Sequence, residues 1–366
     1  MSGSIYGNQF RISTWGESHG KGIGVVVDGC PSGLNLEESI IQRYLDRRKP
    51  GRTKYSTPRK ESDMVEILSG TFENKTTGAP ISMMVHNQNQ HSGDYSDIAS
   101  YYRPGHADYT FSEKYGFRDY RGGGRSSGRE TIGRVAAGAI ASGILNALGI
   151  HVMAYTKSIG DITINYNKCS KDNVMISPLY MPDLDASSLA EDYLLNIMKE
   201  QDSVGGVIEC IVTGMPAGVG DPTFEKLDAN LAKAITSIGA VKGVEIGEGF
   251  GAANLLGSMN NDTWQYDNNR NLSKRSNHAG GILGGISDGS EIILRAAIKP
   301  TPSIGKTQET VNNQKENIQI NVKGRHDPII VPRAVVVVES MVAITLVDML
   351  FANMTSRMDK IIEFYK

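Results

Sequence analysis

The sequence predicts an α+β fold, with antiparallel strands and helices in a single domain. Two turns of the form Gly-x-Pro-x-Gly, Gly29–Gly33 and Gly214–Gly218, each follow a run rich in β-branched residues. Each turn leads into an amphipathic helix, and each helix is followed by a candidate β-hairpin. Strands joined by hairpins, without a helix after every strand, favour antiparallel sheets over a doubly wound parallel sheet.

The first repeated unit covers the N-terminal third of the chain. It is predicted to contain a strand, a helix and a hairpin, at residues 23–27, about 36–47, and 65–72 with 80–85. Asn35 fits the helix N-cap, and Glu38 fits the N3 position that reaches back to it.

The second unit has the same order. Its strand, helix and hairpin are predicted at residues 207–213, about 222–236, and 281–286 with 291–298. Asp221 fits the N-cap of this helix and Pro222 its first position. The repeated order of strand, helix and hairpin suggests an ancient duplication within one domain, 1–366, with halves of about 20–150 and 204–350. Chance recurrence of a common glycine–proline turn is the alternative.

The remaining elements lie between and after these units. Thr131–Leu148 carries an apolar stripe at helical spacing and ends at Gly149, and its many alanines permit close packing in a helical layer. Further predictions are helices at 187–199 and 339–357, strands at 317–322 and 334–338, and a mobile, Asn-rich loop at 258–275.

The composition is that of an ordinary soluble globular protein. The 366 residues are 39% hydrophobic and 21% charged, with a formal net charge of −2, which argues against a nucleic-acid binder that relies on a global positive field. Three widely spaced cysteines indicate a reducing compartment and form neither a disulfide frame nor a zinc motif. We see no bilayer-spanning stretch and no signal peptide, so we expect a cytoplasmic protein.

The most informative segment runs from Arg103 to Glu130. Arg103-Pro-Gly-His106-Ala-Asp-Tyr-Thr is followed by Arg121-Gly-Gly-Gly-Arg125-Ser-Ser-Gly-Arg129-Glu. Glycines let the backbone approach an anion, arginines bind phosphate or carboxylate, and a histidine can donate a proton to a leaving group. The segment therefore predicts a site for an anionic, phosphorylated small molecule. An RGG-type RNA tail is the alternative, although the segment occurs once and leads directly into a helix.

Three other segments carry candidate chemistry. Gly16-Glu-Ser18-His19-Gly20 places a histidine among small residues; it resembles a nucleophile elbow but precedes a strand, so we reject a serine hydrolase. A cationic run, 46–60, suggests a flexible lid over an anion. Strand ends carry Lys299–Ser303 and Gly324–Pro328. Neither a Walker A loop nor a Rossmann motif is present. From these residues alone, we infer an enzyme acting on a polyanion, with His19, His106 and Asp327 as acid–base candidates.

Motifs along nearly the whole chain resemble those of the chorismate synthase family. In chain order they are Gly16–Gly20, Asp46–Gly51, Arg103–Thr110, Arg121–Ser127, Val241–Gly247, Asn277–Gly285 and Gly324–Pro328. The resemblance implies a β-α-β sandwich, with a helical layer between antiparallel sheets, assembled as a homotetramer. It implies conversion of 5-enolpyruvylshikimate 3-phosphate to chorismate and phosphate, with reduced FMN that is not consumed.

The same resemblance implies roles for individual residues. His106 acts on the phosphate, His19 lies at the flavin ring, and Asp327 with Ser18 and Ser127 handles the proton at flavin N5. The implied FMN contacts are Arg125, Ser126, Ser127, Gly239, Ala240, Gly284, Lys299, Pro300, Thr301, Pro302, Ser303 and Arg325. The implied substrate or NADP contacts are Arg48, Lys54, Arg129, Arg134 and Arg333.

The chain departs from the family pattern at a few positions. Lys54 stands where arginine is usual, which weakens the case for a bidentate anion contact there. Gly128 and Gly239 replace the usual alanine and the usual proline or asparagine, which changes backbone freedom. Two other functions remain open: a flavoprotein oxidoreductase, which consumes reductant with each product, and an RNA-binding module. Some family members reduce their own FMN with NADPH, and the sequence does not decide this.

Overall fold

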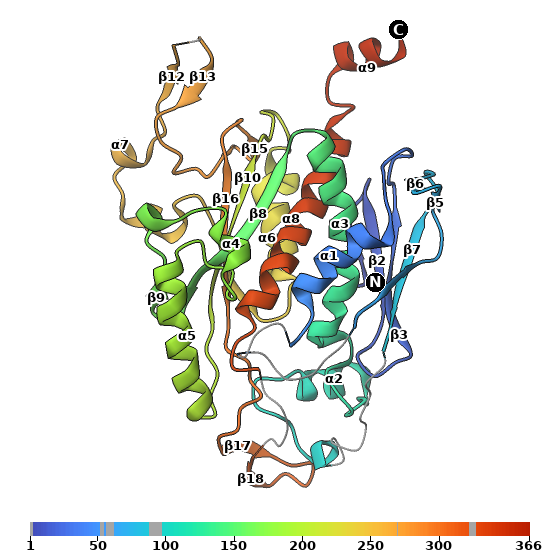
Figure 1. Ribbon diagram of the computed structural model, residues 1–366, viewed down its shortest axis with the longest axis vertical. Coiled ribbons are helices and arrows are strands. Elements are labelled where there is room, and N and C mark those ends of the chain that lie inside the picture. The colour runs from blue at the N-terminus through green and yellow to red at the C-terminus, as the bar shows by residue number, and fades with distance from the viewer. Residues whose placement is uncertain (1–2, 52–54, 56–61, 88–96, 269, 322–326) are drawn as a thin grey trace.

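Two five-stranded antiparallel sheets enclose a layer of helices (Figure 1). The computed structural model describes residues 3–51, 55, 62–87, 97–268, 270–321 and 327–366. The strand order is β1-β2-β3-β7-β4 in the first sheet and β11-β16-β10-β8-β9 in the second. This confirms the predicted α+β sandwich with a helical layer between antiparallel sheets.

The first sheet is built from alternating strands whose apolar side chains face the helices. Its strands are β1 (Ile5–Tyr6), β2 (Arg11–Gly16), β3 (Gly22–Asp28), β4 (Val65–Ile67) and β7 (Ile81–His86). On β7, Ile81, Met83 and Val85 are buried while the residues between them are partly exposed, as the period of two requires. The predicted pairing of the 65–72 and 80–85 segments is confirmed, since Val65 pairs with Val85.

The second sheet differs from prediction in one pairing. Its strands are β8 (His151–Ile159), β9 (Ile162–Thr163), β10 (Gly206–Thr213), β11 (Val241–Ile246) and β16 (Ile292–Ile298). The predicted hairpin between 281–286 and 291–298 is wrong, because β16 pairs with β10 and β11. The 281–286 run instead folds on itself as β14 (Ile282–Leu283) and β15 (Ile286–Ser287), turned by Gly284 and Gly285, which both have positive φ.

Apart from short elements inserted between them, the two halves repeat one order of elements. In the first half, β3 is followed by helix α1 (Glu38–Arg48), β4, a small hairpin, β7 and helix α3 (Thr131–Ala147). In the second half, β10 is followed by helix α6 (Leu227–Thr236), β11, a small hairpin, β16 and helix α8 (Val331–Asn353). The pairing is also repeated: β7 lies between β3 and β4, and β16 lies between β10 and β11. The small hairpins are β5 (Thr71–Phe72) with β6 (Lys75–Thr76), and β14 with β15. The single-domain boundaries and the ancient duplication stay predictions.

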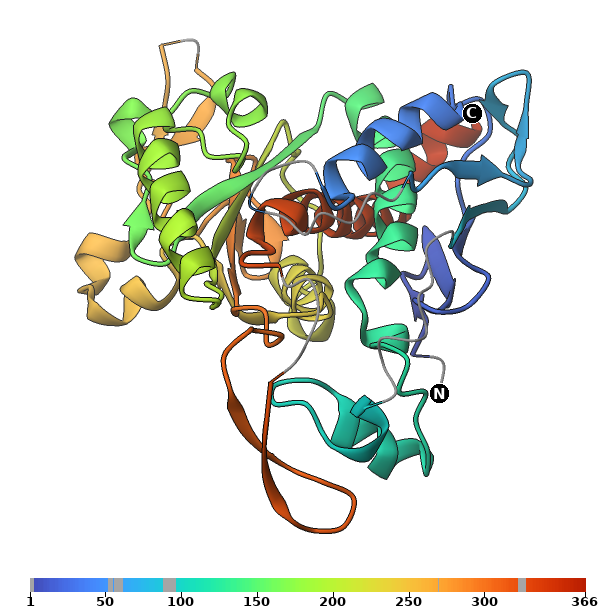
Figure 2. The same ribbon diagram turned by 60° about the horizontal axis from the view of Figure 1, so that its bottom comes forward.

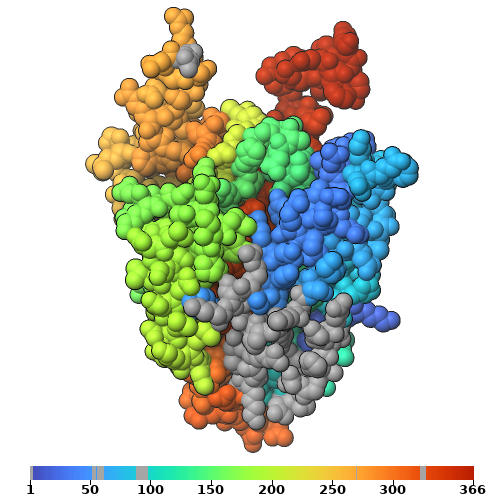
Figure 3. Space-filling model, viewed as in Figure 1, coloured from blue at the N-terminus to red at the C-terminus, as the bar shows by residue number. Residues whose placement is uncertain are grey.

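Helix α8 corrects two expectations. The predicted strand 334–338 lies inside this helix, because its valines are buried on all sides by α3, α6 and the second sheet. Contrary to the sequence analysis, Val331–Asn353 is long and apolar enough to cross a bilayer by length and composition, but most of it is buried inside the molecule. Figure 3 shows most of α8 (red) hidden on the face drawn.

Several helix starts also differ from prediction. Asn35 does not cap α1, whose N-cap is Glu37. Helix α6 begins at Leu227, since residues 223–225 form a 3₁₀ turn after Pro222. Helix α5 (Leu184–Lys199) begins earlier than expected, with the Asp183 carboxylate accepting hydrogen bonds from two backbone N–H groups.

The other elements are short and lie mostly at the ends of the molecule. They are α2 (Asp108–Tyr115), α4 (Asn173–Ile176), α7 (Gly257–Asn260), α9 (Met358–Tyr365), and the hairpins β12 (Trp264–Tyr266) with β13 (Leu272–Lys274) and β17 (Gln308–Val311) with β18 (Asn317–Ile320). The 258–275 segment, predicted to be a mobile, Asn-rich loop, contains part of a helical turn and a hairpin. Figure 2 brings forward the end of the molecule that carries α2 and the β17–β18 hairpin.

Candidate active site

Most of the predicted site residues gather at one end of the sandwich. The β2–β3 turn, the segment before α3, the segment after β16 and the start of α8 meet there, and α2 lies beside them (Figure 2). Because each of these segments is anchored by a buried strand or helix, loops distant in sequence are held in fixed contact.

His106 lies in a loop that one ion pair closes. The Arg103 backbone N–H, Nε and Nη2 all donate to the Asp108 carboxylate, at 2.9, 2.8 and 2.8 Å, and Arg118 lies 2.9 Å away. Burial opposes the charge, but the hydrogen bonds from Arg103 hold the pKa of Asp108 below its usual value. Arg103 and Asp108 therefore shape the loop that presents His106.

The His106 loop packs directly on the segment after β16. His106 Nε2 lies 3.1 Å from Ser303 Oγ, and Lys299 Nζ donates to the Gly105 carbonyl at 2.9 Å. Gly105 has a φ of +69°, and a Cβ there would lie 2.8 Å from Pro302 Cβ. Only glycine fits both the conformation and the contact. The structure thus brings the predicted phosphate-acting residue against the predicted flavin segment.

The neighbours of His106 fix its tautomer. Its Nδ1 lies 3.1 Å from the Pro104 carbonyl, which can only accept, so Nδ1 carries the proton in the neutral ring. Nε2 then accepts a hydrogen bond from the Ser303 hydroxyl. Burial and the positive charge of Arg103 lower the pKa of His106, and Lys299 lowers it slightly further; the Pro104 carbonyl and Asp108 act in the opposite direction without offsetting this. The free site therefore holds a neutral imidazole whose basic nitrogen faces Ser303.

Ser18 and His19 lie in the β2–β3 turn, against the glycine-rich segment. Ser18 Oγ is 3.1 Å from His19 Nδ1, and a Cβ on Gly122 would lie 2.4 Å from His19 Cε1. Arg125 anchors this turn by donating to the carbonyls of Gly16 and Thr14, at 3.1 and 3.2 Å. The position of Ser18 between two antiparallel strands agrees with rejecting a nucleophile elbow, which requires a strand-to-helix turn.

The hydroxyls of Ser126 and Ser127 shape the turn that leads into α3. Ser126 Oγ donates to the Gly123 carbonyl at 2.7 Å, and Ser127 Oγ accepts from the Arg129 N–H at 3.3 Å. Among the described residues, no heavy atom would lie within 4 Å of a Cβ on Gly124 or Gly128, and the same holds for Gly239. The glycines thus border open space beside the arginines.

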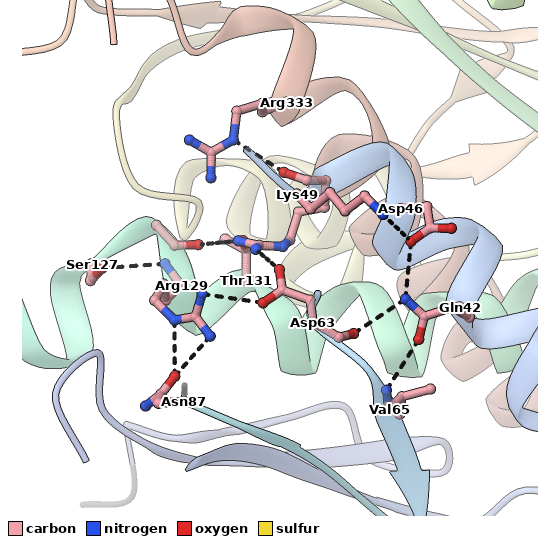
Figure 4. Close-up of polar contacts among 12 residues, drawn as sticks. Gln42, Asp46, Lys49, Asp63, Val65, Asn87, Ser127, Arg129, Thr131 and Arg333 are labelled. Atoms are coloured by element: carbon pink, nitrogen blue, oxygen red, sulfur yellow. Dashed lines mark hydrogen bonds and ion pairs between the residues drawn. The ribbon is translucent and has the colours of Figure 1, made fainter. Parts of the chain in front are cut away.

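A cluster of arginines and carboxylates lies next to this turn (Figure 4). Asp63 forms ion pairs with Arg48 and Arg129, and Arg48 Nη1 also donates to the Gly128 carbonyl at 3.3 Å. Arg48 and Asp63 are only 1% and 2% exposed. Arg48 therefore lies on the buried side of the cluster, whereas Arg129 lies on its partly exposed side.

Arg333, in the first turn of α8, joins the cluster to Asp327. Its Nε donates to the Arg48 carbonyl at 3.1 Å and its Nη1 to Asp327 Oδ2 at 3.0 Å. The carbonyl of Pro328 accepts from the Val204 N–H at 2.9 Å, and Ser203 Oγ donates to the Thr301 carbonyl at 2.6 Å. Asp327 and the Lys299–Ser303 segment are thereby linked. Arg325, Lys54 and His326 lie outside the described residues.

Arg134 belongs to a separate pair. Its Nε donates to Glu130 at 2.8 Å and its Nη1 to Ser237 Oγ at 2.7 Å. Ser237 precedes Gly239 and Ala240, and the Ala240 carbonyl accepts from the Lys299 N–H at 2.9 Å. Arg134 therefore borders the 239–240 segment rather than the Asp63 cluster.

Gly284 does not join the other site residues within one chain. It lies in the β14–β15 turn, next to Gly285, where a Cβ would contact the Asp221 carbonyl at 2.7 Å. The β14–β15 turn comes before the first residue of β16, whereas Lys299 follows its last residue. The seven residues of β16 span roughly 20 Å. Among the described residues, Gly284 is thus an implied flavin contact that lies apart from the Lys299–Ser303 segment within one chain.

Three residues of the site were missed from the sequence. Asp63, Asn87 and Glu130 orient the arginines: Asn87 Oδ1 accepts from Arg129 Nε at 3.0 Å, and Glu130 also accepts from Thr14 Oγ1 at 2.9 Å. A buried carboxylate is stable only with partners, so an acid near a basic run was a usable signal for Asp63. Asn87 has no local pattern that marks it.

Comparisons with known proteins agree with this geometry. The family model described as chorismate synthase matches residues 10–351. The chorismate synthase of Lachnoclostridium phytofermentans is 68% identical over the whole of both chains, and that of Methanocaldococcus jannaschii is 51% identical over 95% of this chain and 96% of its own. A solved structure titled "Crystal Structure of Chorismate Synthase" superimposes with a TM-score of 0.77 at 30% identity, covering 98% of this chain and 97% of that one.

The matched residues include the β2–β3 turn, the His106 loop, the arginine cluster and the segment after β16. Identity above half with the chorismate synthases of Methanococcoides burtonii and Methanocaldococcus jannaschii covers 95% of this chain, and therefore both halves of the sandwich. The chain therefore belongs to the chorismate synthase family and is an enzyme of the lyase class.

Proposed function

We propose that the chain catalyses the anti-1,4-elimination of phosphate and a ring proton from 5-enolpyruvylshikimate 3-phosphate, giving chorismate in aromatic amino acid biosynthesis. The observation that carries this proposal is His106, held beside Lys299 and Ser303 at the end of the molecule that also holds the arginine cluster. A leaving phosphate needs positive charge and an acid nearby, and this end supplies both.

The residues present fit a flavin mononucleotide. Arg125, Lys299, Ser126, Ser127 and Ser303 offer cationic and hydroxyl groups to a phosphate or ring oxygen, and Gly124 and Gly239 border open space. The Thr301 hydroxyl is buried and has no hydrogen-bond partner among the described residues, as expected for a group that a ligand satisfies. Bound reduced FMN supplies electron density that weakens the C–O bond and is not consumed.

The chain's own residues divide the work. His106 Nε2 faces the leaving phosphate. The phosphate dianion raises the pKa of the ring, which takes up a proton from solvent and donates it to the phosphate as the C–O bond breaks. His19 packs against the glycine-rich segment and orients the ring-binding surface. Asp327, held by Arg333, accepts a proton, and Ser18 and Ser127 provide hydroxyls for its transfer. Arg48, Arg129, Arg134 and Arg333 supply the positive field for the substrate anions.

The assembly and setting follow the family. We propose a homotetramer acting in the cytoplasm, with no nucleic acid or membrane partner. In a tetramer, Gly284 of one subunit would contact the flavin site of another, since within one chain it lies far from Lys299. NADPH is the reductant that we propose to test for the bound flavin.

An anaerobic assay tests the proposal. Purified protein, substrate and photoreduced FMN should give chorismate and phosphate in equal amounts, while the reduced flavin remains. Oxidation of one flavin per product would instead favour an oxidoreductase, and tight RNA binding that weakens steeply with salt would favour the RNA-binding module. Replacing photoreduction by NADPH and oxidised FMN in air, without another reductase, shows whether the chain reduces its own flavin.

A further inference from the structure

We propose that Asp63 is a positioning residue that fixes the Arg129 guanidinium for substrate binding. This inference rests on the proposed function and concerns a residue that none of the sequence motifs singled out. Asp63 touches neither of the acid–base histidines, so it acts through the arginines.

Asp63 divides its two carboxylate oxygens between two arginines. Oδ2 accepts from Arg48 Nη2, and Oδ1 accepts from Arg129 Nη1 at 3.2 Å (Figure 4). Because Arg48 and Asp63 are both almost fully buried, this pair is shielded from water and its geometry is rigid. The buried pair therefore holds the Asp63 carboxylate in a fixed position, from which it accepts the hydrogen bond of Arg129.

Asn87 holds Arg129 from the other side. Its Oδ1 accepts from Arg129 Nε and Nη2, at 3.0 and 2.8 Å. Its Nδ2 donates to the carbonyls of Glu17 and Gly20, at 2.9 and 2.8 Å, which flank Ser18 and His19. The Arg129 guanidinium is thus held between Asp63 and the turn that carries His19.

The backbone of Asp63 is itself constrained. Its φ is +45°, a left-handed conformation that is uncommon outside glycine. Gln42 on α1 clamps this segment, since its Nε2 donates to the Asp63 carbonyl at 3.3 Å and its Oε1 accepts from the Val65 N–H at 3.1 Å. Residues held in such conformations cluster at functional sites, because the surrounding structure must maintain them.

Two roles of Asp63 make opposite predictions. If its carboxylate only reduced the positive potential, its removal would tighten the binding of an anionic substrate. If it orients Arg129, its removal would weaken binding, because a guanidinium that has lost its contact with Asp63 can shift away from bidentate geometry although Asn87 still holds its other side. The direction of the change in affinity therefore separates the two roles.

The experiment compares Asp63→Asn and Asp63→Glu with the wild-type chain, and all three proteins are saturated with oxidised FMN. Calorimetry with 5-enolpyruvylshikimate 3-phosphate should show the dissociation constant rising by about tenfold or more for Asp63→Asn. Asp63→Glu keeps the charge but displaces it, and should raise the constant by about threefold. In turnover assays KM should rise more than kcat falls. The control Asp28→Asn, which removes a carboxylate from the exposed pair with Arg11, should change binding by less than about twofold.

The outcomes are separable. Unchanged or tighter binding by a folded Asp63→Asn protein would overturn the proposal, with folding checked by circular dichroism. Should Asp63→Asn not fold, wild-type affinity in Asp63→Glu would overturn it equally. A wild-type chain that neither binds nor converts this substrate would refute the proposed function instead.

Discussion

His106 illustrates how neighbouring groups prepare a side chain for its chemistry. The Pro104 carbonyl accepts a hydrogen bond from His106 Nδ1, and Nε2 faces Ser303. Burial and the nearby charges of Arg103 and Lys299 disfavour the imidazolium form. A general acid that is neutral in the free site must gain its proton when an anion arrives. The residue thus couples substrate binding to its own protonation.

We predict that the pKa of His106 rises when 5-enolpyruvylshikimate 3-phosphate binds. The free-state pKa lies below the usual value, and a phosphate dianion near Nε2 stabilises the imidazolium. Binding therefore takes up a proton, and affinity should increase as pH falls through the range in which His106 titrates, as long as the phosphate stays ionised. NMR titration of the ring with and without substrate measures this, and equal values in the two titrations would contradict it.

His106→Ala should lower turnover by roughly 10²–10⁴-fold, the contribution of a positioned proton donor. Binding of oxidised FMN should change little, since Lys299, Arg125 and the glycines remain. His151→Ala offers a matched control, because that exposed histidine on β8 contacts only Asn146 through its side chain in the described contacts. Near wild-type turnover in His106→Ala would exclude its role toward the phosphate.

Asp327→Asn should cut turnover strongly while preserving folding, because asparagine keeps the size and can still accept a hydrogen bond from Arg333. Turnover and thermal unfolding measured on the same preparations check both parts. The neighbouring His326 is the competing base. An active Asp327→Asn protein beside an inactive His326→Ala protein would transfer the role to the histidine.

At the scale of elements, the helical layer depends on a close crossing of α3 and α8. Gly138 on α3 faces Ser340 on α8, and a Cβ on Gly138 would lie 2.2 Å from Ser340 Cβ. Both sides are fully buried. The predicted alanine-rich close packing of 131–148 is therefore realised against the helix that the sequence analysis partly assigned to a strand. This crossing matters for the site, because the N-terminal ends of both helices carry site arginines.

Gly138→Ala should destabilise the chain by about 1–3 kcal/mol, despite the better helix propensity of alanine, because the added methyl group overpacks the crossing. Gly143→Ala, in the same helix, should be neutral or slightly stabilising, since its Cβ would meet Leu34 at an ordinary 3.6 Å. Denaturant unfolding of both variants measures the difference. Equal stabilities would show that the crossing relaxes.

At the scale of the whole molecule, both halves of the sandwich contribute to one end. The first half provides His19, His106 and Arg129, and the second provides Lys299, Ser303 and Arg333. Hydrogen bonds between these segments tie the halves together, so a ligand that orders one segment orders its neighbour.

We predict that FMN and substrate bind cooperatively, because the two polyanions share these segments. Substrate should tighten the binding of oxidised FMN by roughly 5- to 150-fold, the usual range of coupling between sites. Flavin fluorescence titrations with and without substrate measure the effect. Equal dissociation constants would rule out the coupling. Most of the cationic loop 48–60, predicted to close over the ligands, lies outside the described residues.

The sequence by itself determined the features whose signals are local. The apolar stripe of α3 marked a helix, the Gly-x-Pro-x-Gly turns marked the repeated units, and His19, His106 and Asp327 stood out because glycines and charges surround them. These signals are short in range, since helix periodicity and turn chemistry act over a few residues.

Only the tertiary structure decided the rest. The valine-rich start of α8 is helical because the layers bury it on every side, and β16 pairs with β11 although residues 247–291 lie between them. Asp63 and Asn87 became site residues through partners distant in sequence, and Gly284 was separated from Lys299 by the length of a strand. Burial and strand pairing depend on which surfaces meet, and that is a property of the assembled chain.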